Sequence, residues 1–580
     1  MPTPAELLKE YWGFDAFRPL QEEIIRELLG GRDVLALLPT GGGKSVCYQI
    51  PALCKAGFCL VISPLIALMK DQVEGLRKKG ISAAFIHTGM TYPEMTIILQ
   101  HALNGRLKLL FVSPERIETT LFQEYLPGFD ISLIAVDEAH CISAWGHDFR
   151  PAYRRIAALR ETLPDVPVLA LTATATPAVQ SDIKKQLRLV PPAVFQGPLL
   201  RPNLAFSIVS DGTKQERLLG ILDRVPGSSI VYCNSRKGTE NIARLLNERG
   251  ITADYYHGRL PAGSRHKKQA SWIEDRVRTM VCTSAFGMGI DKSDVRLVVH
   301  YDVPDSLENY YQEAGRAGRD ANLSQAVLLH DAGAARYLSQ LPNLRYPEEQ
   351  VIREVYRDLV HFLQIPAESG DMEWFDFPLD TFLSRFNKNT TTTLYALKAL
   401  EQEEILLYTE QSYQPARVTF IVNKDRLYLF QKSNPALVPL IEALLRNYPG
   451  VFDYPTVIYE RQLASLIRMD EAQVAVLLQQ MDRSALISYQ PQASLPQVRL
   501  LQPRVRMENL RIDYRNLLLR KEECIKRVTQ MITYLEQTTE CRSQFINRYF
   551  GDVQALPCGI CDVCTARQRS TTGAPPEGPS

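Results

Sequence analysis

The 580-residue sequence has no dominant charge of either sign and no long apolar run. Lys and Arg number 66 against 65 Asp and Glu, which leaves a formal net charge of +1. A chain-wide basic surface is therefore excluded, and any surface for nucleic acid must be a local patch. Because no apolar run could span a bilayer and residues 1–10 lack a signal-peptide layout, we expect neither a membrane protein nor a secreted one.

Cysteine is scarce over most of the chain and concentrated near one end. Of the 11 cysteines, six are scattered among apolar residues before position 283, as is typical of small buried side chains. Four others have metal-site spacing, with short Cys-x-x-Cys steps after a longer one: Cys541, Cys558, Cys561 and Cys564. In a reducing compartment four thiolates indicate tetrahedral Zn²⁺, with a redox role as the alternative. Cys524 lies almost five helical turns before Cys541 and is not expected to be a ligand.

Up to residue 344, short apolar runs alternate with longer helical stretches. Such runs occur at 33–38, 58–63, 107–113, 133–137 and 168–172, and again at 229–233, 252–256, 279–282, 297–300 and 326–329. The segments between them are long enough for crossover helices, which is typical of a parallel sheet covered on both faces. We predict an α/β fold of two similar lobes, residues 1–199 and 200–344, with a hinge near Gly197 to Pro202.

The pattern changes after residue 344. The stretches 381–421 and 461–501 each contain two helical runs followed by two strand-like runs, which is the order of a winged helix. We expect each stretch to form its own hairpin, 405–408 with 417–422 and 486–489 with 497–501. Residues 345–504 are thus predicted to be a winged-helix-like region, either single or tandem. A helical zinc-binding module at 505–565 and a disordered tail at 566–580 follow.

A glycine-rich segment with a lysine follows the first predicted strand. Residues 38–45 read Leu-Pro-Thr-Gly-Gly-Gly-Lys-Ser, and a helical stretch comes next. The glycine backbone can curl around phosphate, the lysine can reach the β- and γ-phosphates, and the serine hydroxyl can ligate Mg²⁺. Leu38 stands where the simple P-loop pattern has its first glycine, and a plain glycine-rich turn is the alternative. The residues expected to bind nucleotide here are Thr40, Gly41, Gly42, Gly43, Lys44 and Ser45.

An acidic pair and two distant arginines can supply the remaining phosphate chemistry. Residues 137–140 read Asp-Glu-Ala-His at the end of a predicted strand, where Asp137 can hold Mg²⁺ and Glu138 can orient or deprotonate the attacking water. Residues 314–319 read Ala-Gly-Arg-Ala-Gly-Arg. Taken alone, each feature is more often solvated surface, but together with the glycine-rich segment they favour catalysis in a site built between the lobes. The predicted catalytic residues are Lys44, Asp137, Glu138, His140, Arg316 and Arg319, with Arg319 as the finger and Arg316 on the γ-phosphate.

These motifs resemble those of a RecQ-family DNA helicase of helicase superfamily 2. Residues 14–21 are similar to the family's adenine-reading motif, which implies that Gln21 hydrogen-bonds the adenine and Arg18 flanks it. Residues 286–292 are similar to motif V, which implies nucleotide-binding roles for Gly289 and Asp291. Residues 314–319 fall in the similar motif VI.

Residues 135–153 resemble the family's DEAH box followed by an aromatic-rich loop. In relatives this loop couples single-stranded DNA to ATP hydrolysis. The physical chemistry agrees, since bases stack on aromatic rings and arginine neutralises phosphate. A Trp and a Phe in the hydrophobic core would be the alternative. The DNA-binding residues implied here are Trp145, His147, Phe149 and Arg150.

The resemblance implies two RecA-like lobes and an ATP-dependent DNA helicase that moves 3′ to 5′ in recombination and repair. The implied cofactors are ATP, Mg²⁺ and Zn²⁺. The implied partner is DNA, either single-stranded or as a tailed or forked duplex. No association with a membrane is expected. A single-stranded-DNA-binding protein is one candidate protein partner, and a cytoplasmic location, on the nucleoid in a bacterium, is expected.

The order of the later domains departs from the usual RecQ layout, in which the zinc module follows the motor and precedes a winged helix. Here the winged-helix-like region comes first, which leaves the strand-separating element unassigned. A translocase or RNA helicase with the same engine stays open, as does a non-catalytic DNA-binding or annealing scaffold. Six basic residues are either phosphate contacts or a solvated face: Arg504, Arg506, Arg511, Arg515, Arg520 and Lys521.

Overall fold

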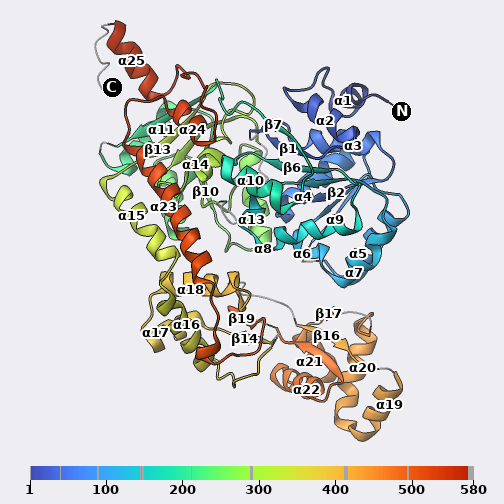
Figure 1. Cartoon of the computed structure of the whole chain (residues 1–580). Coiled ribbons are helices and arrows are strands. Elements are labelled where there is room, and N and C mark those ends of the chain that lie inside the picture. The colour runs from blue at the N-terminus through green and yellow to red at the C-terminus, as the bar shows by residue number, and fades with distance from the viewer. Residues whose placement is uncertain are drawn as a thin grey trace. The chain divides into compact units, whose positions relative to one another are not determined.

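The structure is a computed structural model. It describes residues 2–39, 41–87, 90–143, 146, 149–210, 212–287, 292–371, 373–410, 416–422, 424–452, 455–492 and 495–572. The chain divides into two compact units. The first comprises Met1–Met90, Thr96–Pro342 and Glu522–Ser580, and the second comprises Thr91–Met95 and Asn343–Lys521. The predicted α/β fold is confirmed, because the first unit contains two parallel sheets flanked by helices (Figure 1).

The first lobe is built on a 7-stranded parallel sheet in the order β3-β4-β2-β5-β6-β1-β7. Its central strands are short runs of fully buried apolar residues, as expected for a sheet that is covered on both faces. The strands are β1 (Val34–Leu37), β2 (Phe58–Ile62), β3 (Ala83–Ile86), β4 (Leu109–Val112), β5 (Ile131–Val136), β6 (Val168–Thr172) and β7 (Ala193–Gln196).

Helices α3 and α4 pack on one face of this sheet, where Tyr48, Met69 and Val73 join its core. The helices of this part of the chain are α1 (Pro4–Trp12), α2 (Gln21–Leu29), α3 (Val46–Cys54), α4 (Ile66–Lys78), α5 (Tyr92–Leu103), α6 (Pro114–Ile117), α7 (Thr120–Tyr125), α8 (Pro151–Arg154), α9 (Leu159–Thr162) and α10 (Pro177–Gln186).

The second lobe repeats this plan with a 6-stranded parallel sheet in the order β10-β11-β9-β12-β13-β8. Helices α11 and α12 supply Leu218, Leu222 and Leu246 to its core. The strands are β8 (Leu204–Val209), β9 (Ser228–Tyr232), β10 (Ala253–Tyr256), β11 (Thr279–Cys282), β12 (Val295–His300) and β13 (Ser324–Leu329). The helices are α11 (Lys214–Arg224), α12 (Arg236–Glu248), α13 (Ala262–Ile273), α14 (Leu307–Ala314) and α15 (Ala332–Arg345).

The predicted hinge segment between β7 and β8 is hydrogen-bonded to both lobes. The backbone N–H of Gly197 donates to the first lobe at Leu37 O, 2.8 Å away. The Tyr311 hydroxyl of the second lobe donates to Leu199 O at 2.7 Å. Arg201 donates to Gly315 O at 2.7 Å, in the turn that carries the predicted arginine finger. The segment therefore connects the two lobes and also contacts the turn that carries the two predicted catalytic arginines.

The second unit contains two winged-helix folds, one inserted into the other. The outer fold has the sheet β14-β19-β15, and the inner fold has the sheet β17-β16-β18. Each has its own hydrophobic core. The outer fold consists of α16 (Glu349–Phe362), β14 (Trp374–Asp376), α17 (Leu379–Phe386), α18 (Thr390–Gln402), β15 (Leu406–Thr409) and β19 (Gln497–Leu500). The inner fold consists of β16 (Arg417–Phe420), α19 (Lys424–Ser433), α20 (Val438–Asn447), β17 (Thr456–Val457), α21 (Glu460–Ile467), α22 (Glu471–Arg483) and β18 (Ile487–Gln490).

The expected hairpin pairing is wrong, because the two strand pairs exchange partners. Strand β15 pairs with β19, not with β16, and places Leu406 opposite Leu500. Strand β16 pairs with β18 and places Phe420 opposite Ile487. Each exchange buries both apolar residues of the pair. The four strands have similar length and alternation, so local pattern could not distinguish the two pairings.

Three helices follow: α23 (Tyr514–Glu536), α24 (Arg542–Tyr549) and α25 (Asp562–Thr572). Helix α25 extends seven residues beyond 565, so the expected disordered tail is wrong for 566–572, while 573–580 lie outside the described residues.

Among the six candidate phosphate contacts, Arg520 is buried and donates to Gln402. Arg504 donates to Ile365 O, whereas Arg506, Arg511 and Arg515 are exposed. None of the helices among the described residues is both long enough and apolar enough to cross a membrane.

Candidate nucleotide, nucleic-acid and zinc sites

The glycine-rich segment forms a tight loop between β1 and α3. Gly41 and Gly43 have φ values of +81° and +77°, a region that favours glycine. A Cβ at Gly43 would lie 2.4 Å from Gln21 Nε2, and a Cβ at Gly42 would lie 2.9 Å from Pro39 O. The loop therefore admits only glycine at these positions, which leaves its backbone free to approach a phosphate closely. Thr40 lies outside the described residues.

The two residues of the predicted adenine motif hold this loop. The Gln21 amide donates to Gly43 O at 2.9 Å, and the Arg18 guanidinium donates to Gly41 O. Gln21 Oε1 in turn accepts from the backbone N–H of Arg18 at 2.9 Å. Both side chains are thus placed beside the nucleotide loop, and the contact with adenine stays a prediction.

The acidic pair lies at the carboxyl end of β5, next to the loop. Burial and the neighbouring Glu138 charge together raise the pKa of Asp137 to about 6, and the Lys44 ammonium opposes them. The Asp137 carboxylate accepts from the backbone N–H of Glu138 at 3.0 Å. A buried carboxylate beside a second carboxylate is suited to hold a divalent cation, which would relieve the repulsion between them. Ser45, the other predicted magnesium ligand, lies at the start of α3.

His140 connects this pair to the neighbouring strand. Its Nδ1 lies 3.4 Å from Glu138 Oε2 and 2.9 Å from the hydroxyl of Thr172, the last residue of β6. His140 is 1% exposed, so the contact is shielded from solvent. Glu138 has a φ of +48°, a left-handed conformation that a non-glycine residue adopts only when its surroundings hold it there. The arrangement fixes the position of Glu138.

The two predicted arginines reach the site from the second lobe. A Cβ at Gly41 would lie 3.3 Å from Arg319 Cγ, so the Arg319 side chain lies against the glycine-rich loop. Arg316 is 4% exposed, and its Nε has no hydrogen-bond partner among the described residues. A buried guanidinium nitrogen without a partner needs an acceptor, which a phosphate oxygen would provide. The residues present therefore fit a nucleotide triphosphate.

The predicted aromatic loop is described only in part, because Trp145 and His147 lie outside the described residues, as do Gly289 and Asp291 of motif V. Arg154 lies over the Phe149 ring, 4.8 Å from its centroid. Arg150 donates to Pro64 O at 3.4 Å, beside the segment that precedes α4. A Cβ at Gly146 would lie 2.7 Å from His140 O, so the backbone at Gly146 lies against the last residue of the DEAH segment.

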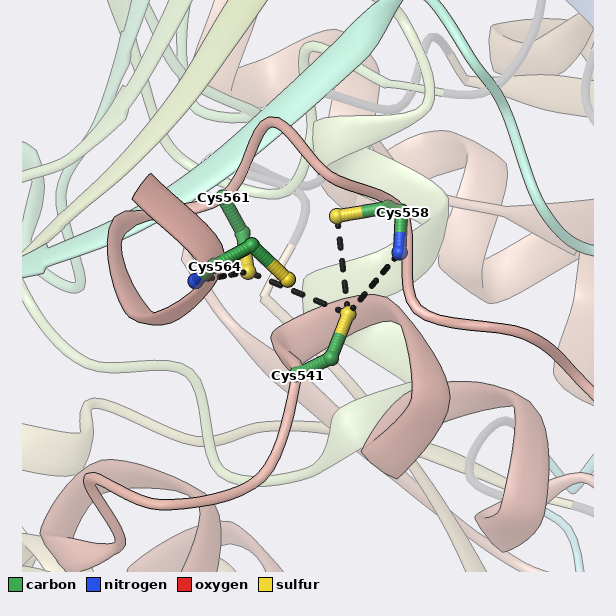
Figure 2. Close-up of side chains that lie close together, drawn as sticks. All are labelled: Cys541, Cys558, Cys561 and Cys564. Carbon is green, nitrogen blue, oxygen red and sulfur yellow. Dashed lines mark hydrogen bonds between the residues drawn. The ribbon is translucent and has the colours of Figure 1, made fainter. Parts of the chain in front are cut away.

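The four predicted zinc ligands come together where α24 and α25 begin, and Figure 2 shows their side chains converging. Their sulfur atoms all lie within 4.8 Å of one another. Cys541 Sγ is 3.5 Å from Cys558 Sγ and 3.8 Å from Cys561 Sγ. Four sulfurs at ~2.3 Å from a tetrahedral zinc ion lie ~3.8 Å apart, so the cluster fits Zn²⁺. Cys524 is buried in α23 and is not part of the cluster.

The cysteine cluster is joined to the second lobe through Asp562. Its carboxylate accepts from Arg542 Nε at 3.0 Å and from the backbone N–H of Ile208, in edge strand β8, at 3.0 Å. Arg542 also donates to Tyr534 O at 2.7 Å and is 4% exposed. Zinc in this module would therefore stabilise the local fold and its attachment to the motor.

Sequence reasoning missed several residues of the site because their neighbours are distant in sequence. Thr172 orients His140, and Arg201 and Asn203 hold the arginine turn through Gly315 O and Gly318 O. Thr172 is the last residue of the apolar run 168–172, and nothing in that run indicates a contact with His140. Arg201 gave no signal either, since an arginine in a linker is normally solvated.

Comparison with protein families matches four parts of the chain. The matches are to the DEAD/DEAH box helicase family at 18–183, the helicase conserved C-terminal domain at 213–321, the RecQ helicase winged-helix domain of Bacteroidota at 418–491, and the RecQ zinc-binding family at 505–565. The winged-helix match coincides with the inner fold. The predicted order, with winged-helix material before the zinc module, is thereby confirmed.

Individual proteins that are similar to this chain point to the same family. The chain is 45% identical to the ATP-dependent DNA helicase RecQ of Pasteurella multocida (strain Pm70) over 340 residues, 58% of this chain and 54% of that protein. It is 35% identical to the probable ATP-dependent DNA helicase RecS of Bacillus subtilis (strain 168), covering 72% of this chain and 86% of that protein. It is 41% identical to RecQ of Synechocystis sp., covering 56% and 70%. The chain thus spans about half the length of the Pasteurella relative, and it belongs to the RecQ family of ATP-dependent DNA helicases.

Proposed function

We propose that this chain is an ATP-driven motor that unwinds duplex DNA with 3′ to 5′ polarity. One observation carries the proposal beyond family membership. Arg319 of the second lobe lies against Gly41 in the nucleotide loop of the first lobe. A nucleotide between them would contact both lobes, and its hydrolysis would remove the γ-phosphate that such an arginine binds. The lobes would then separate, which is the movement a motor needs.

The proposed roles of the nucleotide-site residues follow from their positions. The Gly41–Gly43 backbone and Lys44 would bind the phosphates, and Ser45 and Asp137 would hold Mg²⁺, which neutralises charge on the β- and γ-phosphates. Glu138 would orient or deprotonate the attacking water, with His140 holding its carboxylate. The neighbouring Thr172 hydroxyl fixes the His140 ring at 2.9 Å.

The proposed DNA site is the aromatic loop. Trp145 and Phe149 would stack on the bases, and His147 and Arg150 would contact the DNA phosphate backbone. Gly146 of this loop lies next to the DEAH segment, since a Cβ there would clash with His140 O. A shift of the loop on DNA binding would therefore reach the residues that hold Glu138. This contact supports coupling between DNA and hydrolysis.

A DNA substrate implies a location with the chromosome, which in a bacterium is the cytoplasm, and roles in recombination and repair. A single-stranded-DNA-binding protein would meet the motor on the displaced strand. Both statements rest on the proposed activity.

The test is ATP hydrolysis and strand separation on matched duplexes with a 3′ or a 5′ single-stranded tail. Lys44→Ala is the control, because it removes the phosphate-binding ammonium. We expect hydrolysis stimulated by DNA more than by RNA of the same sequence, and unwinding of only the 3′-tailed duplex. Hydrolysis no faster than that of Lys44→Ala would support a non-catalytic scaffold instead.

A translocase that does not separate strands is the second candidate, and the nested winged helices favour it. The outer wing strands β15 and β19 are separated by the whole inner fold, so they do not form a short hairpin. If a short wing is needed to part the strands, this chain would move along DNA without unwinding it. Displacement of streptavidin from a biotinylated single strand, without duplex unwinding, would identify that activity.

A further inference from the structure

Behind the arginine turn, the carboxyl ends of three neighbouring strands bring aromatic and charged side chains together. Tyr232 ends β9 and His300 ends β12, and these two residues are direct partners in the parallel register. Their rings are therefore stacked, with centroids 5.3 Å apart and planes 18° from parallel. His300 Nε2 lies 2.9 Å from Glu313 Oε2 on α14. Tyr232 thus occupies a fixed position close to the turn that carries Arg316.

The hydroxyl of Tyr232 has a defined direction. It donates to Phe286 O at 2.9 Å, in the segment that follows β11. Because its one proton is used there, the oxygen can act only as an acceptor toward its other neighbour. The nearby Arg316 guanidinium, which carries only donors, lowers the pKa of Tyr232 against the effect of burial. Burial keeps the pKa of Tyr232 well above its ordinary value, so the hydroxyl stays protonated and this polarity is maintained.

Arg316 is confined on its other side as well. A Cβ at Gly287 would lie 3.0 Å from Arg316 Nη2, so the guanidinium is packed against the backbone there. It is 4% exposed, and its Nε has no partner among the described residues. The guanidinium is therefore confined by the Gly287 backbone, lies near Tyr232, and has an unfilled donor.

We infer that Tyr232 is a positioning residue for ATP hydrolysis, which holds the Arg316 guanidinium so that its remaining donors face the γ-phosphate. The inference rests on the proposed function for the identity of the ligand. Arginine has several rotatable bonds, and fixing it before the reaction lowers the entropy cost of forming the transition state. The stacked His300 ring, held by Glu313, keeps Tyr232 in place.

The test is Tyr232→Phe, which removes the hydroxyl and retains the stacked ring. The matched control is Tyr301→Phe, which removes a tyrosine hydroxyl beside His300 and outside this network. We expect Tyr232→Phe to lower kcat of DNA-stimulated hydrolysis between about tenfold and a hundredfold, with KM for ATP changed by less than about twofold. Tyr301→Phe should leave both within about twofold of wild type. Equal kcat in the two variants would overturn the inference.

A second readout does not depend on turnover. Affinities for ADP and for ADP with aluminium fluoride, a mimic of the transferring phosphoryl group, are measured by competition against a fluorescent ADP analogue. Tyr232→Phe should weaken only the aluminium fluoride complex, and it should add no further loss to Arg316→Ala. An unchanged ratio of the two affinities, or additive losses in the double variant, would overturn the role of Tyr232. If wild-type protein binds ADP with aluminium fluoride more tightly than ADP and yet does not hydrolyse ATP, only the proposed function would be contradicted.

Discussion

Replacing Asp562 with Ala tests how the zinc module is attached to the motor. Asp562 pairs with Arg542, whose side chain is 4% exposed, and it also accepts from Ile208 N–H. Removing one partner of a buried ion pair costs ~3–5 kcal/mol. The Asp562 side chain is 25% exposed and Arg542 keeps the Tyr534 and Gln537 carbonyls, so the lower end applies. We therefore expect a loss of about 3 kcal/mol, or a roughly 10²-fold rise in the opened population.

The assay follows zinc release with a chromogenic chelator over a urea series, because zinc reports this module alone. The matched control is Glu540→Ala, which also removes a carboxylate next to a zinc cysteine. Its partner Arg548 is 55% exposed, so the expected loss is below ~1 kcal/mol. Both variants should hold stoichiometric zinc without urea, since all four cysteines remain. Equal urea midpoints for the two variants would refute the assignment of the buried pair as the attachment.

Three further outcomes are expected. Gly43→Ala should abolish binding of a fluorescent ATP analogue, because the new Cβ would lie 2.4 Å from Gln21 Nε2 and because the backbone at residue 43 is left-handed. Near-normal affinity would contradict the loop geometry. Cys558→Ser should lose zinc by atomic absorption and lower the yield of folded protein by on the order of tenfold or more, and retained stoichiometric zinc would count against the site. Trp145→Ala with Phe149→Ala should reduce stimulation of ATP hydrolysis by single-stranded DNA about tenfold while ATP affinity is kept, and unchanged stimulation would argue against base stacking.

The sequence predicted the elements whose signal is local and missed several strands at sheet edges. The glycine-rich loop, the acidic pair and the cysteine cluster are each encoded within a short stretch. Five strands escaped prediction: β3, β7, β8, β14 and β17. All five are edge strands, and β7 and β8 are only partly buried, so they lack the continuous apolar run that marks a central strand.

Residues whose roles depend on tertiary contact could not be predicted either. Tyr232 ends a strand in a common apolar pattern, and only the register with His300 and the hydrogen bond to Phe286 O distinguish it. Arg201 lies in a linker, where exposure is the ordinary expectation, yet it binds the carbonyls of the arginine turn. The pairing of the wing strands could not be predicted for the same reason, since each strand pairs with residues 67 to 94 positions away in the sequence.

The nested winged helices impose an order on the folding of this part of the chain. Residues 497–500 must be available before the outer sheet can close, because β19 is the strand that joins β14 to β15. If the inner fold forms first, its entry at Arg417 and its exit at Gln490 are brought together as paired residues. The free loop that remains is then short, which lowers the entropy cost of closing β15 on β19 by about 2 kcal/mol. A mutation confined to the inner core would therefore also slow the maturation of the outer fold during synthesis.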